Sequence, residues 1–231
     1  MNDHPSTEAG RREAPIEVAI LLFDGLTALD CLGPYEVLQN VPMIECKFVA
    51  EKPGLIRTEG GPLVIEAQHS LEAVRNPGVV LVPGGAGNRQ LLKNQTVLDW
   101  LREAHRTSRW TTSVCTGSLV LGAAGLLDGL RATGHWMFLE PLHSFGAEPT
   151  SQRVVIEAEP RIITAAGVSA GIDMALRLLE ILFAREVAEA AQLAIEYDPQ
   201  PHIDAGSPAK APAAAVELLR SDFAGYPTEA S

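Results

Sequence analysis

The chain has 231 residues, of which 46% are hydrophobic and 20% are charged, a composition typical of a globular protein with one large core. Lys and Arg number 18 against 29 Asp and Glu, a formal net charge of −11, which argues against a nucleic-acid-binding surface because such a surface needs concentrated positive charge. No run of residues approaches the roughly 20 apolar residues that span a bilayer, so we expect no membrane contact.

The N-terminus and the cysteines indicate the cellular setting. Residues 1–14 carry several charges and no apolar stretch, so they cannot form the apolar region of a signal peptide, and we expect a disordered tail and no export. Cys31, Cys46 and Cys115 make an odd count without CxxC spacing, which predicts neither a disulfide framework nor a zinc site. A reducing cytoplasm is the simplest setting.

After the tail, the sequence predicts a buried strand and then a helix. Residues 16–23 form a continuous apolar run rich in Ile, Val and Leu, as in a buried parallel strand, and Asp24-Gly25 ends it. A helix is expected from Thr27 to Gln39. Pro34 falls near its middle, where a proline either kinks the helix or marks its true beginning.

The remaining chain alternates strand-like and helix-like segments, which predicts a doubly wound α/β sandwich with one mostly parallel sheet and no second domain. Further strands are expected at residues 46–50, 63–66 (an edge or hairpin strand), 79–82, 109–114 and 131–136, and at the hairpin pair 154–157 and 162–164. Further helices are expected at residues 95–106, 116–127, 136–145, 169–183, 185–197 and 216–223.

Three unusual segments follow predicted strands: Asp24-Gly25, Pro83-Gly84-Gly85 and Cys115-Thr116. Ligands of open α/β sheets bind outside the carboxyl ends of the strands. Because the three segments are far apart in the sequence and would meet at one edge of the sheet, they predict a site there.

The stretch Ser113-Val114-Cys115-Thr116-Gly117 has the pattern of a nucleophile elbow. A lone Cys stands between a strand-like and a helix-like run, with small residues two places before and after it, as a sharp and strained turn requires. The following helix would direct N–H groups and its positive dipole end at the sulfur, which favours a thiolate. The alternative is a buried structural cysteine at a strand end.

Backbone amides can receive the negative charge that develops during thiolate attack. An elbow supplies the N–H of the residue after the nucleophile, Thr116. A second N–H can come from Gly84-Gly85, since glycine lets the backbone approach a ligand closely. The alternative for the two glycines is an ordinary turn.

Two side chains can manage protons beside Cys115. His135, in Gly134-His135-Trp136, either faces the site or caps a helix. Asp30 is flanked by apolar residues, and a buried Asp is uncommon unless it is paired or protonated. Burial beside another anion raises the pKa of such an acid, so that it can donate a hydrogen bond and later a proton. The alternative for Asp30 is a helix N-cap.

These segments together resemble the ThiJ/PfpI superfamily, over roughly residues 15–208, and within it the isonitrile hydratase branch. On that resemblance residues 209–231 form a C-terminal tail with a short helix. The residues that carry the resemblance are Leu21 to Gly25, Leu29-Asp30, Gly33 to Val37, Val82 to Gly85, Ser113 to Leu127, Arg131 to Thr133, His135-Trp136, Gly171 to Asp173 and Asp204 to Pro208.

The resemblance implies a homodimeric α/β sandwich without a metal or an organic cofactor. It implies that Cys115 is the nucleophile and Asp30 its acidic partner, where many branches of the superfamily use Glu. It assigns backbone donors to Thr116 and Gly85, and pocket positions to Gly84, His135 and Val168.

Two segments depart from the pattern of the branch. Gly134 stands where relatives usually have Ser or Thr, and Ala165-Ala166-Gly167 stands where they are richer in Gly. We expect these departures to affect the size of the substrate rather than the chemistry.

The implied activity is that of a hydratase, a carbon–nitrogen lyase, which adds water to an isonitrile and gives an N-substituted formamide through a covalent cysteine thioimidate. A glyoxalase- or deglycase-like enzyme is disfavoured by Asp30 and Thr116, because those branches usually have Glu for the acid and often His near the Cys. A protease or amidotransferase normally needs a Cys–His pair, for which only His135 stands nearby. A non-enzymatic small-molecule or redox sensor is the remaining alternative, although about 25 residues after Asp204 are too few for a DNA-binding domain.

Overall fold

The computed structural model describes residues 14–222, and nearly all of the predicted N-terminal tail lies outside this range. The core is a seven-stranded sheet in the order β10-β11-β7-β6-β1-β2-β5, in which only β10 runs antiparallel to its neighbour. The strands of this sheet are β1 (Ile16–Leu21), β2 (Ile44–Ala50), β5 (His69–Ser70), β6 (Val79–Val82), β7 (Trp110–Val114), β10 (Val154–Glu157) and β11 (Ile162–Ala165).

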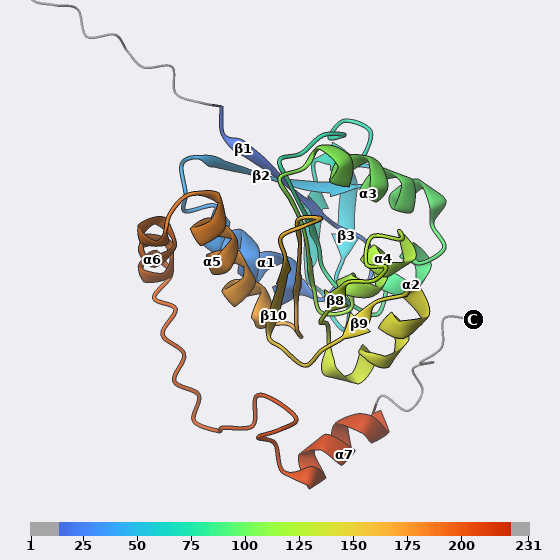
Figure 1. The fold of residues 1–231 in the computed structure, drawn as a ribbon, viewed down its shortest axis with the longest axis vertical. Coiled ribbons are helices and arrows are strands. Elements are labelled where there is room, and N and C mark those ends of the chain that lie inside the picture. The colour runs from blue at the N-terminus through green and yellow to red at the C-terminus, as the bar shows by residue number, and fades with distance from the viewer. Residues whose placement is uncertain (1–13, 223–231) are drawn as a thin grey trace, which may run out of the picture.

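Helices cover both faces of the sheet (Figure 1). On one face α1 packs against α5, and α5 packs against α6; on the other lie α2, α3 and α4. The predicted doubly wound α/β fold is therefore confirmed. These helices are α1 (Ala28–Leu38), α2 (Asn88–Leu91), α3 (Gln95–Thr107), α4 (Gly117–Ala123), α5 (Ala170–Leu182) and α6 (Arg185–Ala194).

The central strands of the sheet are buried on both faces. All four residues of β6 and all five residues of β7 are buried, because helices shield both faces of a parallel sheet. In β7, however, three of the five residues are polar: Thr111, Thr112 and Ser113. The hydroxyl of Thr112 donates to the carbonyl of Val80 at 2.9 Å, so hydrogen bonding within the sheet offsets the burial of that group.

Smaller elements surround the main sheet. The expected strand near residues 63–66 is β4 (Val64–Ala67), which forms an antiparallel hairpin with β3 (Gly54–Arg57). The strand expected at residues 131–136 is only β8 (Arg131–Ala132), and it pairs with β9 (Glu148–Pro149) outside the main sheet. The helix expected at residues 136–145 consists of two 3₁₀ helices, η1 (Trp136–Phe138) and η2 (Glu140–Phe145).

Two helix predictions need correction. The helix after Cys115 was expected to reach Leu127, but it ends at Ala123, and Gly125 follows with a φ of 76°, a left-handed conformation that commonly terminates helices. Helix α1 begins at Ala28, so Pro34 lies inside it and does not mark its start.

After α6 the described chain leaves the sandwich, but its last part returns to it, because the Arg220 guanidinium lies over the Trp136 ring at 5.9 Å from its centre (Figure 1). It ends in α7 (Ala213–Asp222), and Asp222 is the last residue that the structure describes. Leu218 and Leu219 are exposed on this helix. The division into a domain at 15–208 and tails at either end remains a prediction.

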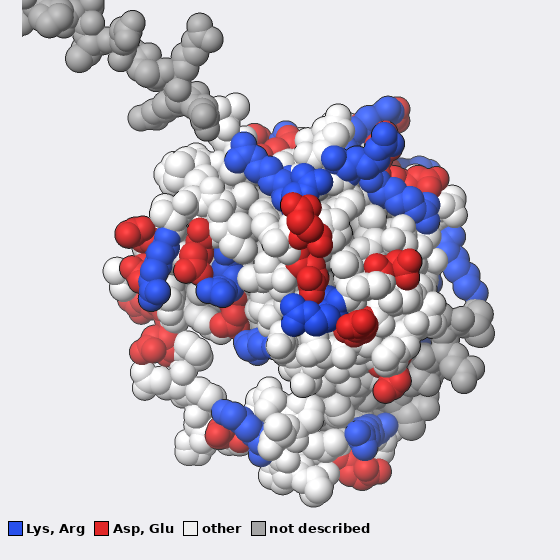
Figure 2. Space-filling model, viewed as in Figure 1, with Lys and Arg blue, Asp and Glu red and all other residues white. Residues whose placement is uncertain are grey.

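The surface carries mixed charge. Figure 2 shows basic and acidic side chains interspersed on one face, and ion pairs such as Arg153–Asp173 and Arg131–Glu157 occur in the structure. In the part of the chain that the structure describes, no helix has the length and apolar character needed to cross a bilayer.

Candidate active site

The three predicted segments meet at the carboxyl edge of the sheet, where the strand order reverses between β1 and β6. The chain proceeds from β1 towards β2 and β5 on one side, and from β6 towards β7 and β11 on the other. Such a switch point leaves a crevice for a ligand. Asp30 follows β1, Gly84 follows β6 and Cys115 follows β7, so the topology brings the three together.

Cys115 has the strained backbone of a nucleophile elbow. Its φ is 58°, in the left-handed region that residues with a Cβ rarely adopt. Its N–H donates to the carbonyl oxygens of Ala165 and Ala166 at 3.1 and 3.0 Å, and its carbonyl accepts from the Ser118 hydroxyl at 3.1 Å. Backbone bonds on both sides therefore hold the strained turn, and the side chain is only 5% exposed.

Asp30 lies within α1 and is completely buried, with 0% exposure. The N-cap position belongs to Thr27, so the alternative of an N-cap role for Asp30 is wrong. Its Oδ2 instead accepts from the backbone N–H of Gly84 at 2.9 Å, across to the loop after β6. Oδ1 is buried without a hydrogen-bond partner among the described residues, an unusual state for a carboxyl oxygen.

The Asp30 carboxyl group and the Cys115 thiol influence each other's protonation. Burial raises the pKa of Asp30 to about 7, and the Gly84 N–H and the neighbouring Cys115 thiol only partly oppose this rise. Burial also raises the pKa of Cys115, and the charge of Asp30 adds to the rise. Because the two groups interact closely, they titrate as a pair and share protons.

The helix dipole and the burial of Cys115 act in opposite directions on the ionisation of its thiol. The N–H groups of Thr116 and Val168 do lower the pKa of Cys115, but burial outweighs them. Burial and the charge of Asp30 therefore oppose ionisation of Cys115, and a thiolate at this position stays a prediction.

The N–H groups of Gly84 and Gly85, from which a second backbone donor was expected, already have partners. The N–H of Gly84 donates to Asp30, and the N–H of Gly85 donates to the Thr116 hydroxyl at 3.0 Å. A Cβ on Gly84 would lie 2.5 Å from the Thr116 nitrogen, and one on Gly85 would lie 2.4 Å from the Gly25 carbonyl oxygen. Only glycine permits this approach of three loops. The alternative of an ordinary turn does not explain such close contacts.

Val168 lies beside the sulfur, and His135 packs against Gly167, the residue before Val168. Val168 has a φ of 40°, which is strained for a β-branched residue, and its N–H is one of the two that interact with Cys115. His135 packs close to Gly167, where a Cβ would lie 2.8 Å from the imidazole Cδ2. Its Nδ1 accepts a long bond of 3.4 Å from the N–H of Met137, so it caps η1.

Sequence reasoning missed Glu59, in the turn between β3 and β4. Its Oε1 accepts from the Thr27 hydroxyl at 2.5 Å, and its Oε2 accepts from the Ala86 N–H at 2.8 Å. The charge of Glu59 also raises the pKa of both Asp30 and His135. No local pattern marks this Glu, because its partners lie 27 and 32 residues away in the sequence.

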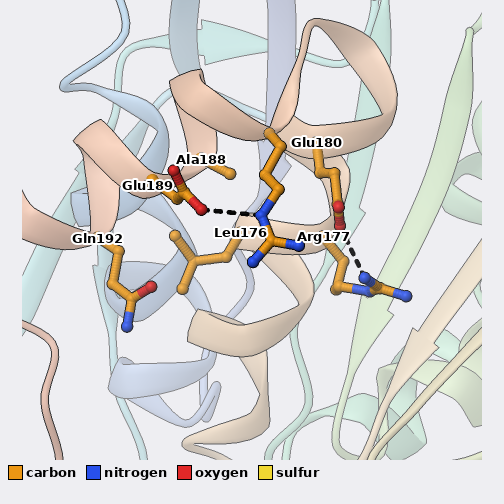
Figure 3. A pocket seen from close by; sticks show the side chains of 7 residues that line it. Leu176, Arg177, Glu180, Ala188, Glu189 and Gln192 are labelled. Atoms are coloured by element: carbon orange, nitrogen blue, oxygen red, sulfur yellow. Dashed lines mark hydrogen bonds and ion pairs between the residues drawn. The ribbon is translucent and has the colours of Figure 1, made fainter.

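A separate groove on the molecule lies between α5 and α6 (Figure 3). Its charged side chains pair with one another: Arg177 with Glu180, and Arg185 with Glu189. It contains no Cys, Ser, Thr or His, so it offers no nucleophile. Across residues 14–222, no three His, Cys, Asp or Glu side chains form a cluster suited to a metal ion.

Comparison with known proteins agrees with this architecture. Residues 16–181 match the DJ-1/PfpI family model. The chain is 40% identical to the isonitrile hydratase of Pseudomonas putida over 205 residues, which cover 89% of each chain.

Solved structures extend the likeness to three dimensions. A crystal structure of a ThiJ/PfpI family protein from Pseudomonas syringae superposes with a TM-score of 0.87 at 33% identity, covering 97% of this chain and 94% of the other. DJ-1beta of Drosophila melanogaster shares the fold with a TM-score of 0.71 at 20% identity, covering 79% of this chain and 98% of the other. The chain therefore belongs to the DJ-1/PfpI family.

Proposed function

We propose that this protein is an isonitrile hydratase-like enzyme, in which Cys115 adds to the substrate and Asp30 transfers the protons. The likeness to the Pseudomonas putida isonitrile hydratase over 89% of both chains supports the substrate class. The observation that carries the proposal is the buried pair at the switch point. A strained Cys115 stands beside a carboxyl group whose pKa is raised to about 7, close to the ideal for an acid–base group at neutral pH.

In the first proposed step the Cys115 sulfur attacks the terminal carbon of the isonitrile R–N≡C. The Asp30 carboxylate takes the thiol proton as the C–S bond forms, and then delivers it to the same carbon. The product is the thioimidate R–N=CH–S–Cys115. In this scheme Asp30 has to be unprotonated at the start, which its raised pKa still allows at neutral pH and above.

In the second proposed step water hydrates the thioimidate. The oxygen of water adds to the carbon while a proton is placed on nitrogen, which gives a tetrahedral carbon bearing OH, NHR and S–Cys115. The C–S bond then breaks, and the hydroxyl proton returns to the sulfur through Asp30. The net reaction is R–N≡C plus water to R–NH–CHO, and the N–H groups of Thr116 and Val168 stabilise the departing sulfur.

The proposed enzyme works in the cytoplasm as a homodimer. The three cysteines are free in the structure, and a catalytic thiol persists best in a reducing compartment. The homodimer is proposed from the resemblance to the superfamily. Light scattering coupled to gel filtration measures it directly, and we expect about twice the monomer mass of 24.7 kDa.

The function is tested by incubating the purified protein with cyclohexyl isonitrile and following N-cyclohexylformamide by NMR. We expect turnover by the wild type and none above background by Cys115→Ala. Cys46→Ala is the matched control, because Cys46 is another free cysteine, located on β2 away from the switch point, and should keep wild-type rates. Formamide formation by a folded Cys115→Ala variant would reject covalent catalysis. Absence of turnover by the wild type would favour the sensor or glyoxalase-like alternative.

A further inference from the structure

We propose that Glu59 positions the loops of the Cys115 site and, through its negative charge, makes the site discriminate against anionic substrates. This inference rests on the proposed function for its substrate arm, but the role of Glu59 towards Cys115 can be measured without any isonitrile. The preferred substrates would be neutral or cationic isonitriles.

The positioning role follows from the contacts of the carboxylate. Oε1 accepts from the Thr27 hydroxyl at 2.5 Å, at the start of the helix that carries Asp30, and Oε2 accepts from the Ala86 N–H at 2.8 Å, in the loop that carries Gly84. The N–H of Glu59 donates to the carbonyl of Leu26 at 2.9 Å. One side chain on the β3–β4 turn therefore joins the loops after β1 and β6.

The charge of Glu59 is not compensated by these contacts. Its two partners are a hydroxyl and an amide, which hydrogen-bond the carboxylate without neutralising it. Although Glu59 is exposed, its charge acts to raise the pKa of Asp30 on α1 and the pKa of His135 before η1. The field of Glu59 therefore reaches the acid partner of Cys115 and the imidazole that packs against Gly167.

The other charged groups nearby do not offset Glu59. Asp24, in the loop after β1, accepts from the backbone N–H of Arg57 at 2.9 Å and adds a second negative charge on this side. Burial makes His135 harder to protonate, because it lowers the pKa of the imidazole. Arg153, directly before β10, is already paired with Asp173 of α5 at 2.5 Å. Neither Asp24, His135 nor Arg153 therefore supplies a free positive charge that would offset Glu59.

The first experiment compares the alkylation of Cys115 by iodoacetamide, which is neutral, and by iodoacetate, which is anionic, with peptide-resolved mass spectrometry to separate Cys115 from Cys46. Glu59→Gln should raise the iodoacetate-to-iodoacetamide rate ratio about fivefold, as loss of one nearby, partly screened charge predicts. Glu66→Gln is the matched control: it removes the same charge from the exposed side of the same hairpin and should leave the ratio unchanged.

Two further measurements separate charge from geometry. Glu59→Asp keeps the charge while shortening the side chain, and should keep the low ratio of the wild type. Glu59→Gln should also move the pH midpoint of Cys115 alkylation by iodoacetamide to lower pH, because the charge of Glu59 raises the pKa of Asp30. The discrimination is rejected if Glu59→Gln matches Glu66→Gln, if both reagents change equally, or if Glu59→Asp behaves like Glu59→Gln.

The substrate arm compares methyl isocyanoacetate with the isocyanoacetate anion. The wild type should show a higher kcat/KM for the ester than for the anion. Glu59→Gln should reduce this ratio about fivefold by raising kcat/KM for the anion. If neither compound is converted, the proposed function fails while the alkylation results still decide the role of Glu59. Equal kcat/KM values for the two compounds in the wild type would overturn the substrate preference.

Discussion

At the scale of single residues, the site combines features that stability alone would not select. Cys115 and Val168 both have positive φ values, of 58° and 40°, and Asp30 is a fully buried acid with one oxygen unpartnered in the described structure. Each feature costs folding free energy. Such costs commonly persist where a protein does its chemistry.

The raised pKa of Asp30 gives a prediction for stability. Its pKa rises from 3.8 to about 7 on folding, so between these values the folded protein binds the proton more tightly than the unfolded chain. Wild-type stability should therefore fall as pH rises through this window and level off above it. Asp30→Asn, whose amide oxygen can still accept from Gly84, should be more stable than the wild type at pH 8 by about 2 kcal/mol.

Urea unfolding at pH 4.5 and pH 8 measures this effect. The advantage of Asp30→Asn should be much smaller at pH 4.5, where the wild-type carboxyl group is protonated in the folded state. An equal advantage at both pH values, or a loss at pH 8, would contradict a raised pKa at this position.

The same residue sets the pH dependence of the thiol. Below about pH 7 Asp30 is protonated and cannot take the proton of Cys115; above it, the carboxylate can. Alkylation of wild-type Cys115 should therefore increase through pH 7. In Asp30→Asn this inflection should disappear, and the rate near pH 7.5 should fall at least tenfold, as loss of a general base commonly does. A preserved inflection in the variant would assign the titration to another group.

At the scale of elements, apolar patterning was sufficient for the long and buried segments. The strands β1 and β6 and the helices α3 and α5 lie where continuous or periodic apolar residues predicted them. Short elements carry too little pattern: α2 has four residues, and the exposed β3 lacks the alternation of a half-buried strand. Their conformation is set by the loops they pack against, which a local pattern does not contain.

The candidate site was also predictable only in part from the sequence. Cys115, Gly84 and Asp30 were found because each directly follows a predicted strand or stands out by its burial. The hydrogen bond from Gly85 to Thr116, the cross-loop contacts of Glu59 and the protonation of the thiol depend on neighbours far away in the sequence. The helix dipole predicted a thiolate, but α4 spans only seven residues and burial dominates.

The packing of the loops gives a prediction at this scale. Gly84→Ala would place a Cβ 2.5 Å from the backbone nitrogen of Thr116, so the loop after β6 must shift away from Cys115. We expect a loss of stability of about 1–3 kcal/mol and a loss of Cys115-dependent turnover. Gly61→Ala is the control, because its Cβ would approach no atom closer than 4.0 Å and should be neutral. Denaturant unfolding and formamide assays measure both, and wild-type behaviour of Gly84→Ala would show that the tight approach is not needed.

At the scale of the whole molecule, we expect the sandwich to stay folded and stable without the C-terminal segment. Among residues 213–221 of α7, for which the structure describes the exposure, all are exposed except Val216, which is partly covered. Truncation after residue 208 should therefore change the free energy of unfolding by less than about 1 kcal/mol, because little apolar surface is lost from the core. Circular dichroism during thermal and urea unfolding measures this. A large destabilisation would mean that α7 is buried against a second subunit.

The central claim is that substrate becomes covalently attached to Cys115 with help from Asp30. Rapid acid quenching of the protein mixed with excess cyclohexyl isonitrile, followed by peptide mass spectrometry, tests it most directly. We predict that the peptide containing Cys115 gains the mass of one isonitrile in the wild type, and that the rate of this gain falls in Asp30→Asn. Steady formamide production without any adduct on Cys115 at any quench time, or an adduct on Cys31 or Cys46 instead, would contradict the account.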